Sequence, residues 1–199
     1  MHSSSYDVVV VGGGVAGSTL AIALARNDIS VLILEKSIRH FDRVRGEFIV
    51  PWGVAEAGTL GILDDLIAAG GSYTIRSVPY GDGVPAEIAR SRSTDMGATI
   101  PGVKGALNIG HPAACEALNA AARRAGARLL MGVSNIVVSG GSRPIVSFEH
   151  QSANHEVSPR LVVGADGRGL QVAKQLKVVY SSDPVHHLLS GMLVDGLDD

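Results

Sequence analysis

Residues 8–35, VVVVGGGVAGSTLAIALARNDISVLILE, decide the fold that this chain is expected to adopt. Residues 6–11 are an apolar, β-branched run that ends at three glycines, which is typical of a strand buried on both faces. Residues 15–25 combine leucines four positions apart with small residues between them, a pattern that predicts a helix packed closely on a sheet. A second β-rich run over 30–34 leads to Glu35. The stretch therefore predicts a β-α-β unit with two parallel strands.

The glycines after the first strand have the spacing GxGxxG, and each would serve a dinucleotide differently. Gly12 permits a tight turn, Gly14 lets a pyrophosphate approach the backbone, and Gly17 lets helix and strand pack closely. The first turn of the helix, at Val15 and Ala16, presents N–H groups and a partial positive charge to the phosphates. The alternative is a glycine loop that only turns the chain. Because strand, glycines, helix and second strand occur in the required order, the pattern favours dinucleotide binding.

An acidic residue ends the β-α-β unit. Glu35 lies 18 residues after Gly17, where a carboxylate can accept hydrogen bonds from a ribose diol. Lys36 adjoins it and belongs to the same expected cofactor-binding set. The loop that follows, residues 36–48, is basic, and two interpretations of it stay open. It is either a solvated loop or a source of bidentate arginine contacts to phosphate.

Composition limits the classes of protein to which the chain can belong. Its 199 residues are 46% hydrophobic and 18% charged with a formal net charge of −2, which predicts a globular chain of about one domain and part of another. With 4% aromatic residues and no block of like charge, no nucleic-acid partner is expected. The single cysteine, Cys115, excludes an internal disulfide and fits a reducing cytoplasm. It is interpreted as a packed thiol, and because the seven histidines show no metal-ligand spacing, no metal is expected.

One segment tests whether the chain enters a membrane. Residues 8–25 are 18 positions without a charge, which is long enough to suggest a spanning helix. Three consecutive glycines argue against a continuous helix there, since each costs about 1 kcal/mol relative to alanine. The leader MHSSSYD has no basic residue of the kind that opens a signal peptide. No membrane partner is therefore expected.

The rest of the chain alternates helical and β-rich segments. Two short helices are predicted over 51–69, and a longer one over 111–125. Short β-like runs, separated by Gly, Pro and Asp turns, are predicted at 73–80, 86–92 and 98–102. Further strands are predicted at 128–133, 136–139, 144–150 and 161–163.

In three motifs the chain resembles the FAD-dependent aromatic hydroxylases, the group A flavoprotein monooxygenases with the para-hydroxybenzoate hydroxylase fold. In the order of that family, the motifs are residues 12–17 (GGGVAG) with Glu35, residues 43–47 (RVRGE) and residues 164–168 (GADGR). The first motif is shared by many dinucleotide-binding proteins, whereas the third is far more diagnostic. The resemblance covers nearly the whole chain.

The resemblance implies an α/β fold: a Rossmann-like FAD-binding domain with part of a second, β-sheet substrate domain. The first would comprise residues 1–71 and 107–180, and the second residues 72–106 and 181–199. FAD would be the cofactor and NAD(P)H the co-substrate. In such enzymes a flavin C4a-hydroperoxide hydroxylates a small aromatic molecule, while the protein binds, orients and excludes water. No catalytic side chain is therefore assigned.

The resemblance also implies roles for residues beyond the first unit. Asp166 and Gly167 would support the flavin side of FAD, with the alternative that Asp166 caps the helix that starts near Arg168. Arg43 and Arg45 would line the pyrophosphate. His111 stands where the family often has an arginine that contacts the flavin.

Several alternatives remain open. The enzyme could be another flavin-dependent oxidoreductase on the same fold, such as an isoprenoid reductase or a halogenase, or the chain could be an FAD-binding piece without catalysis. The family's later Gly-Asp motif does not occur in the sequence. The chain is therefore expected to be an N-terminal fragment that is inactive by itself, and an unpaired sheet edge would favour a homo-oligomer.

Overall fold

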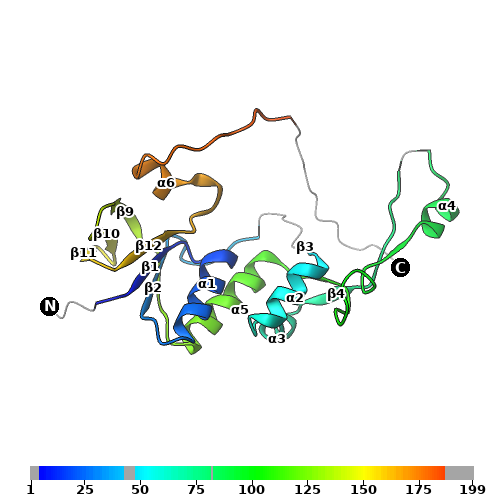
Figure 1. Cartoon of the computed structure of the whole chain (residues 1–199), viewed down its shortest axis with the longest axis horizontal. Helices are drawn as coiled ribbons and strands as arrows, with labels where there is room; N and C mark the ends of the chain where they lie inside the picture. The colour runs from blue at the N-terminus through cyan, green and yellow to red at the C-terminus, as the bar shows by residue number, and fades with distance from the viewer. Residues whose placement is uncertain (1–4, 43–47, 82, 187–199) are drawn as a thin grey trace. The chain divides into compact units, whose positions relative to one another are not determined.

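The computed structural model describes residues 5–42, 48–81 and 83–186. The chain divides into two compact units, one made of residues 1–44 and 115–199 and the other of residues 45–114. Figure 1 shows the order of the elements along the chain, and each unit is described by itself.

The first unit is built on a parallel sheet of four strands in the order β12-β1-β2-β8. These strands are β1 (Val8–Val11), β2 (Val31–Glu35), β8 (Arg128–Met131) and β12 (Leu161–Gly164). Every residue of β1 and β2 is buried, because both strands lie in the middle of the sheet. Helix α1 (Val15–Ala25) connects β1 to β2, so the predicted β-α-β unit is confirmed. The α/β fold class is confirmed with it.

Helix α5 (His111–Arg124) carries the chain into this unit and precedes β8. Its sequence opens with proline in the first turn and ends before Gly126, whose φ of +104° only glycine adopts easily. The helix predicted over 111–125 is therefore confirmed. Its buried face carries Cys115, Leu118 and Ala122.

An antiparallel sheet of three strands packs on the parallel sheet through a shared apolar core. The strands are β9 (Ser134–Ser139), β10 (Ile145–His150) and β11 (Ala153–Val157). The core residues they share with the parallel sheet are Val9, Val11, Leu32, Leu34, Val133, Val138, Val146, Phe148 and Val172. The sequence analysis did not predict β11, because its three central residues are polar and exposed and give no apolar run.

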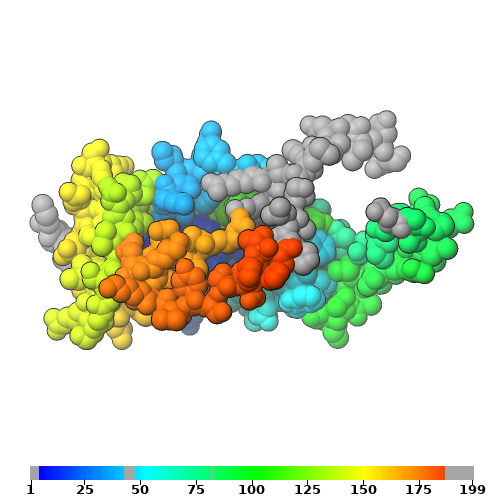
Figure 2. Space-filling view, turned by 90° about the horizontal axis from the view of Figure 1, so that it is seen from above, coloured from blue at the N-terminus to red at the C-terminus, as the bar shows by residue number. Residues whose placement is uncertain are grey.

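The end of this unit is short and irregular. After β12 come a 3₁₀ turn (Gly167–Gly169) and helix α6 (Gln171–Gln175). The segment that follows has no helix or strand, and it is drawn in orange on the near side of Figure 2. Val179 is 98% exposed and Val185 is 82% exposed.

The second unit contains short helices and small antiparallel sheets. Its elements are β3 (Phe48–Ile49), α2 (Pro51–Thr59), α3 (Leu63–Ala68), β4 (Ser72–Thr74), β5 (Arg76–Ser77), α4 (Ala86–Ser91), β6 (Thr94–Asp95) and β7 (Ala106–Asn108). Strands β3, β7 and β4 form one sheet in that order, and β5 pairs with β6. The two short helices predicted over 51–69 are confirmed as α2 and α3.

Two of the predicted β-like runs in this unit are wrong. Residues 86–91 of the predicted run 86–92 form helix α4 instead. Pro85 precedes its first residue, Glu87 lies in its first turn and Arg90 in its last, which suits the helix dipole. Residues 98–102 form turns rather than a strand. Gly102 there has a φ of +79°, which belongs to turns and not to strands.

The uncharged stretch 8–25 is split between a strand and a helix with glycines between them. In the ranges that the structure describes, no helix has the length and apolarity to cross a membrane.

Candidate dinucleotide-binding site

The loop between β1 and α1 is shaped by two backbone contacts that leave no room for side chains. Gly12 has a φ of +115°, and a Cβ on it would lie 2.3 Å from the carbonyl oxygen of Ala165. A Cβ on Gly17 would lie 2.0 Å from the carbonyl oxygen of Gly12. The backbone of helix α1 therefore packs directly on the backbone of the loop, and the loop packs in the same way on the turn that follows β12.

Gly14 differs from both, because a Cβ there would meet nothing within 4 Å. It is the N-cap residue of α1, and no side chain of the described residues caps the helix. Val15 is 40% exposed, and Ala16 is exposed as well. The first-turn N–H groups of a helix have no intrahelical acceptor. The start of α1 therefore offers open space and free donors to an anionic group.

Glu35 is the last residue of β2 and is buried, with 7% of its surface exposed. Its Oε2 accepts a hydrogen bond from the N–H of Gly13 at 2.7 Å, and its Oε1 accepts one from the N–H of Ser37 at 2.8 Å. A carboxylate has about four lone-pair sites, so two remain for a hydroxyl-bearing ligand. Lys36 next to it is exposed.

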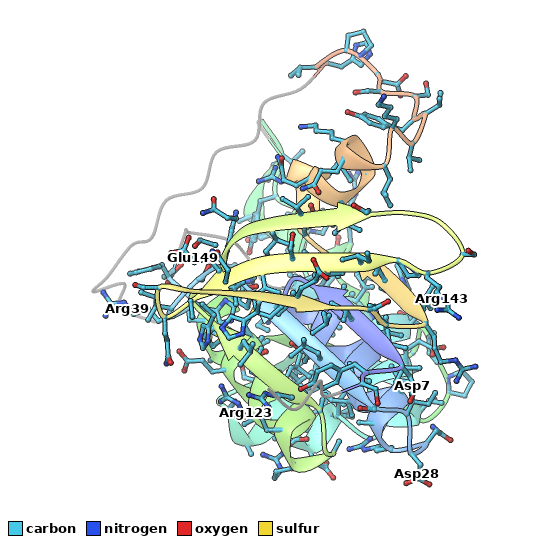
Figure 3. All side chains as sticks on the ribbon, turned by 90° about the vertical axis from the view of Figure 1, so that its left-hand side faces the viewer. Asp7, Asp28, Arg39, Arg123, Arg143 and Glu149 are labelled. Carbon is cyan, nitrogen blue, oxygen red and sulfur yellow. The ribbon has the colours of Figure 1, made fainter. Side chains whose placement is uncertain are left out.

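A pocket of about 220 Å³ lies at the carboxyl ends of β2 and β8. Met131, one of its lining residues, pairs in register with Glu35. The lining residues are Ile38, Arg39, His40, Glu116, Asn119, Arg123, Leu129 and Met131. Figure 3 labels Arg39 and Arg123, and it shows Arg39 far from Asp7, the residue before β1. The pocket therefore lies at the same end of the parallel sheet as the glycine loop, which is where open α/β sheets bind ligands.

A buried polar chain connects the glycine loop to this pocket. Ser18 is fully buried and Asn119 is 4% exposed. The hydroxyl of Ser18 lies 3.1 Å from the carbonyl oxygen of Gly13 and 2.7 Å from Oδ1 of Asn119. The amide Nδ2 of Asn119 lies 2.9 Å from Nε2 of His40. The sequence analysis missed these residues, although a polar Asn119 on the apolar face of a predicted helix was a visible signal.

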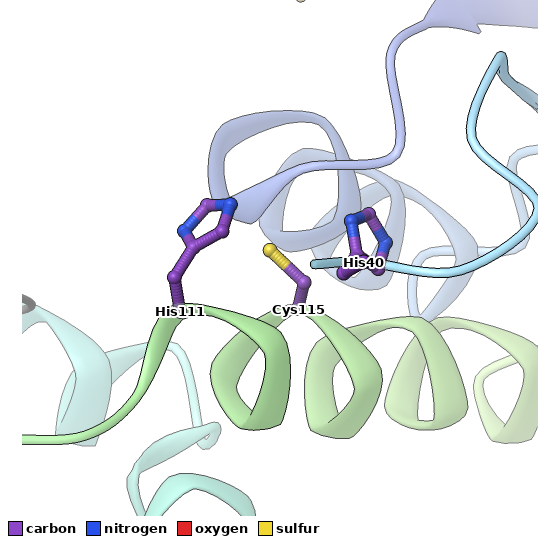
Figure 4. A group of neighbouring side chains, drawn as sticks. All are labelled: His40, His111 and Cys115. Carbon is purple, nitrogen blue, oxygen red and sulfur yellow. The ribbon is translucent and has the colours of Figure 1, made fainter. Parts of the chain in front are cut away.

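His111 is the first residue of α5 and is half-buried. Cys115 lies one turn further along the same helix and is fully buried, so its interpretation as a packed thiol agrees with its burial. Figure 4 shows His111 and Cys115 projecting from the same helix, α5.

The turn after β12 carries the third motif, residues 164–168. Gly167 has a φ of +71°, and Oδ2 of Asp166 accepts a hydrogen bond from the N–H of Val172 at 3.1 Å. Asp166 therefore accepts a hydrogen bond from the first turn of α6, whose N-cap residue is Leu170. The interpretation that it caps a helix starting near Arg168 differs from this, because its side chain does not cap the 3₁₀ turn at Gly167–Gly169. The contact of Asp166 with a cofactor stays a prediction, and the predicted Arg43 and Arg45 lie outside the described residues.

Comparison with known proteins adds family membership to this geometry. A family model described as "FAD binding domain" matches residues 5–195. A squalene epoxidase of Aspergillus fumigatus is 47% identical over 60 residues, which are 30% of this chain and 12% of that protein.

Solved structures extend the likeness over most of the chain. The anhydrotetracycline hydroxylase OxyS from Streptomyces rimosus matches with a TM-score of 0.76 and 22% identity, covering 92% of this chain and 36% of that one. CabE, an aromatic hydroxylase from angucycline biosynthesis, matches with a TM-score of 0.66 and 25% identity, covering 87% and 33%. The chain thus spans about a third of these hydroxylases.

Proposed function

The chain belongs to the FAD-binding domain family, and on that premise we propose that it is the FAD-binding part of a monooxygenase that uses NAD(P)H and O2 to hydroxylate a small aromatic molecule. The observation that carries the proposal is the start of α1, where Gly14 leaves open space beside free N–H groups. The buried carboxylate of Glu35 is hydrogen-bonded to Gly13 in the same loop. Both features fit a dinucleotide.

The residues present fit FAD in three places. The pyrophosphate would lie against the backbone of Gly14, Val15 and Ala16, where a side chain would take the space it needs. Glu35 would accept hydrogen bonds from the adenosine ribose with its remaining lone pairs. The pocket beyond β2 would receive the adenine, because it adjoins Glu35 and has a partly apolar lining.

Other residues complete the proposed set. Asp166 and Gly167 would meet the flavin side, since their turn touches the glycine loop through Ala165 and Gly12. His111 would contact the cofactor from the start of α5. For Lys36, Arg43 and Arg45 the proposal rests on the sequence alone, and Lys36 is exposed.

When bound, FAD supplies the redox and oxygen-transfer chemistry. The described residues of this chain contribute binding and orientation. Glu35 holds Gly13 in place, and the Ser18 hydroxyl lies against the carbonyl oxygen of the same residue, so the loop is fixed before a ligand arrives. Such preorganisation lowers the entropic cost of binding.

The aromatic substrate is supported by the likeness to an aromatic hydroxylase, CabE. A second candidate is favoured by the sequence match to a squalene epoxidase, which points to oxygen transfer to a carbon–carbon double bond of an isoprenoid. Both candidates share the FAD site. They differ in the acceptor of the oxygen atom.

The test has two stages. Titration of the metal-free 199-residue chain with FAD, followed by flavin fluorescence and visible absorption, should show one bound FAD for each chain, and the absence of binding would refute the cofactor site. The full-length enzyme that contains this chain is then given NAD(P)H with phenolic compounds or with linear isoprenoids. A hydroxylated phenol identified by mass spectrometry supports the first candidate, and an epoxide supports the second.

A further inference from the structure

We propose that Ser18 is a positioning residue for the dinucleotide site and that Asn119 orients its hydroxyl. Together they hold the peptide between Gly13 and Gly14 in the orientation that directs the N–H of Gly14 toward the expected pyrophosphate. The inference rests on the proposed function, because the pyrophosphate is the group that this N–H would bind. All four residues belong to the first unit.

Three successive peptides of the glycine loop are each held by a hydrogen bond. The carboxylate of Glu35 accepts a hydrogen bond from the N–H of Gly13, which fixes the peptide before that residue. The hydroxyl of Ser18 lies 3.1 Å from the carbonyl oxygen of Gly13, and the N–H of Ser18 donates to the carbonyl oxygen of Gly14 at 3.0 Å. Gly13 precedes the N-cap residue of α1, so the hydroxyl acts on the loop and not on a carbonyl inside its own helix.

The middle peptide, between Gly13 and Gly14, is the one that can turn over. It is a trans peptide, so its C=O and N–H groups point in opposite directions. Because the carbonyl oxygen faces the buried Ser18, the N–H of Gly14 points away from Ser18. A half-turn would offer a carbonyl oxygen to the anion instead and would move φ of Gly14 from −76° to positive values, which glycine tolerates. Glycine therefore permits both orientations, and the hydroxyl of Ser18 selects the one that binds an anion.

Asn119 determines where the hydroxyl of Ser18 donates. Its side-chain amide lies 2.7 Å from Oγ of Ser18 and joins α5 to α1. A hydroxyl has one proton, so it donates either to Gly13 or to Asn119. With the amide turned so that its N–H₂ faces Ser18, the amide donates to the hydroxyl and the hydroxyl donates to Gly13. The amide oxygen then accepts a hydrogen bond from Nε2 of His40, which lies 2.9 Å from the amide.

The first experiment contains no FAD. Heteronuclear NMR on the ligand-free chain of 199 residues compares the amide resonance of Gly14 in the parent and in Ser18→Ala. The resonance should shift or broaden by exchange in Ser18→Ala, because the peptide then samples both orientations. Ser158→Ala is the matched control, because it removes a serine–carbonyl hydrogen bond of the same 3.1 Å from the same unit. An unchanged Gly14 resonance in Ser18→Ala would overturn the proposal.

The second experiment is a double-mutant cycle on FAD affinity, measured by flavin fluorescence. Ser18→Ala should weaken FAD binding roughly three- to tenfold, the range expected for one neutral hydrogen bond. Asn119→Leu should weaken it by at least about twofold, and the double variant should bind no worse than Ser18→Ala, because Asn119 acts through Ser18. Additive losses would contradict this role and would assign Asn119, which lines the pocket, to direct contact with the ligand.

Thermal unfolding separates positioning from a purely structural role. Ser18→Ala leaves the buried amide of Asn119 short of a partner, so its melting temperature should fall. The double variant replaces both polar groups by apolar ones and should regain most of the melting temperature while FAD affinity stays low. It therefore stays informative if Ser18→Ala does not fold. An affinity that recovers together with the melting temperature would limit the pair to the stability of the fold.

The outcomes also distinguish this inference from the proposed function. A parent chain that does not bind FAD refutes the proposed function, and this inference with it. A parent chain that binds FAD, with Ser18→Ala equal to it, refutes only the positioning role.

Discussion

Oε2 of Glu35 accepts a hydrogen bond from the N–H of Gly13 at 2.7 Å, and this bond joins the end of β2 to the middle of the glycine loop. The carboxylate therefore shapes the loop in addition to its proposed contact with the ribose. Removing the charge should therefore loosen the loop and lower the affinity of the ligand site together. An acid that only contacts a ligand would affect the affinity alone.

We expect Glu35→Gln to lower FAD affinity by roughly one to two orders of magnitude, because a hydrogen bond to a charged group contributes about 1.5–3 kcal/mol. Flavin fluorescence titration measures the change. Glu56→Gln is the control, because Glu56 is an exposed acid of α2 and its variant should bind FAD like the parent. Unchanged FAD affinity in Glu35→Gln would remove Glu35 from the site.

Gly14 and Gly17 should respond to substitution in opposite ways. Gly14→Val should keep the melting temperature of the parent, because a Cβ there meets nothing, yet lose most FAD binding. Gly17→Ala should destabilise the fold by at least about 2 kcal/mol, since its Cβ would lie 2.0 Å from a backbone oxygen. Thermal unfolding and flavin stoichiometry measure the two effects. Normal flavin stoichiometry in Gly14→Val would argue against pyrophosphate contact at that residue.

Two roles of Asp166 can be tested separately: its hydrogen bond to the first turn of α6 and its negative charge at the flavin side. Asp166→Ala should lower stability by about 1 kcal/mol, because the N–H of Val172 loses its acceptor. Asp166→Asn keeps a capping oxygen and should retain that stability. If Asp166→Asn also binds FAD as the parent does, capping accounts for the residue, whereas weaker binding at equal stability assigns its charge to the flavin side.

Asp7 gives the first unit a dependence on pH. A hydrogen bond from the N–H of Ser30 and one from Arg160 lower the pKa of the Asp7 carboxyl below its ordinary value of 3.8. Because the unfolded chain takes up this proton at a higher pH, the stabilisation is fully present above about pH 3.8. It is lost as the pH falls through the lower, folded pKa.

The stability difference between the parent and Asp7→Asn should therefore be constant near neutral pH and should shrink below about pH 4. Urea unfolding at several pH values measures it. Asp28→Asn is the control, because it removes the same charge in an exposed turn. A difference between parent and Asp7→Asn that persists unchanged at the acid end would show that the charge of Asp7 does not stabilise the fold.

Local periodicity accounts for what the sequence predicted. The valine run, the glycine spacing and the terminal Glu35 each depend on neighbours in the chain, and together they predicted the β-α-β unit. Strand β11 was missed because Gln151 and Ser152 turn the hairpin with φ values of 52° and 61°, without the usual glycine. The sequence analysis missed helix α4 because a helix of six residues is too short to show a hydrophobic period. The residues at the ends of so short a segment determine whether it is a helix or a strand.

The candidate site, like the fold, was predicted only in part. The loop and its acid followed from spacing, whereas the chain from Ser18 through Asn119 to His40 joins residues 101 and 79 positions apart. No local sequence pattern indicates that these three residues lie together in the fold.

The contact between Gly12 and Ala165 also bears on how the chain acquires its structure. Strand β1 lies between β2 and β12, and β12 is synthesised about 150 residues after β1. Parallel pairing over such a separation forms slowly, because the long intervening segment must lose conformational entropy before the contacts between the two strands can form. During synthesis, one edge of β1 therefore stays unpaired until residues 161–165 have left the ribosome. The glycine loop reaches its final geometry only then, so ligand binding should mark the last step of folding in this unit.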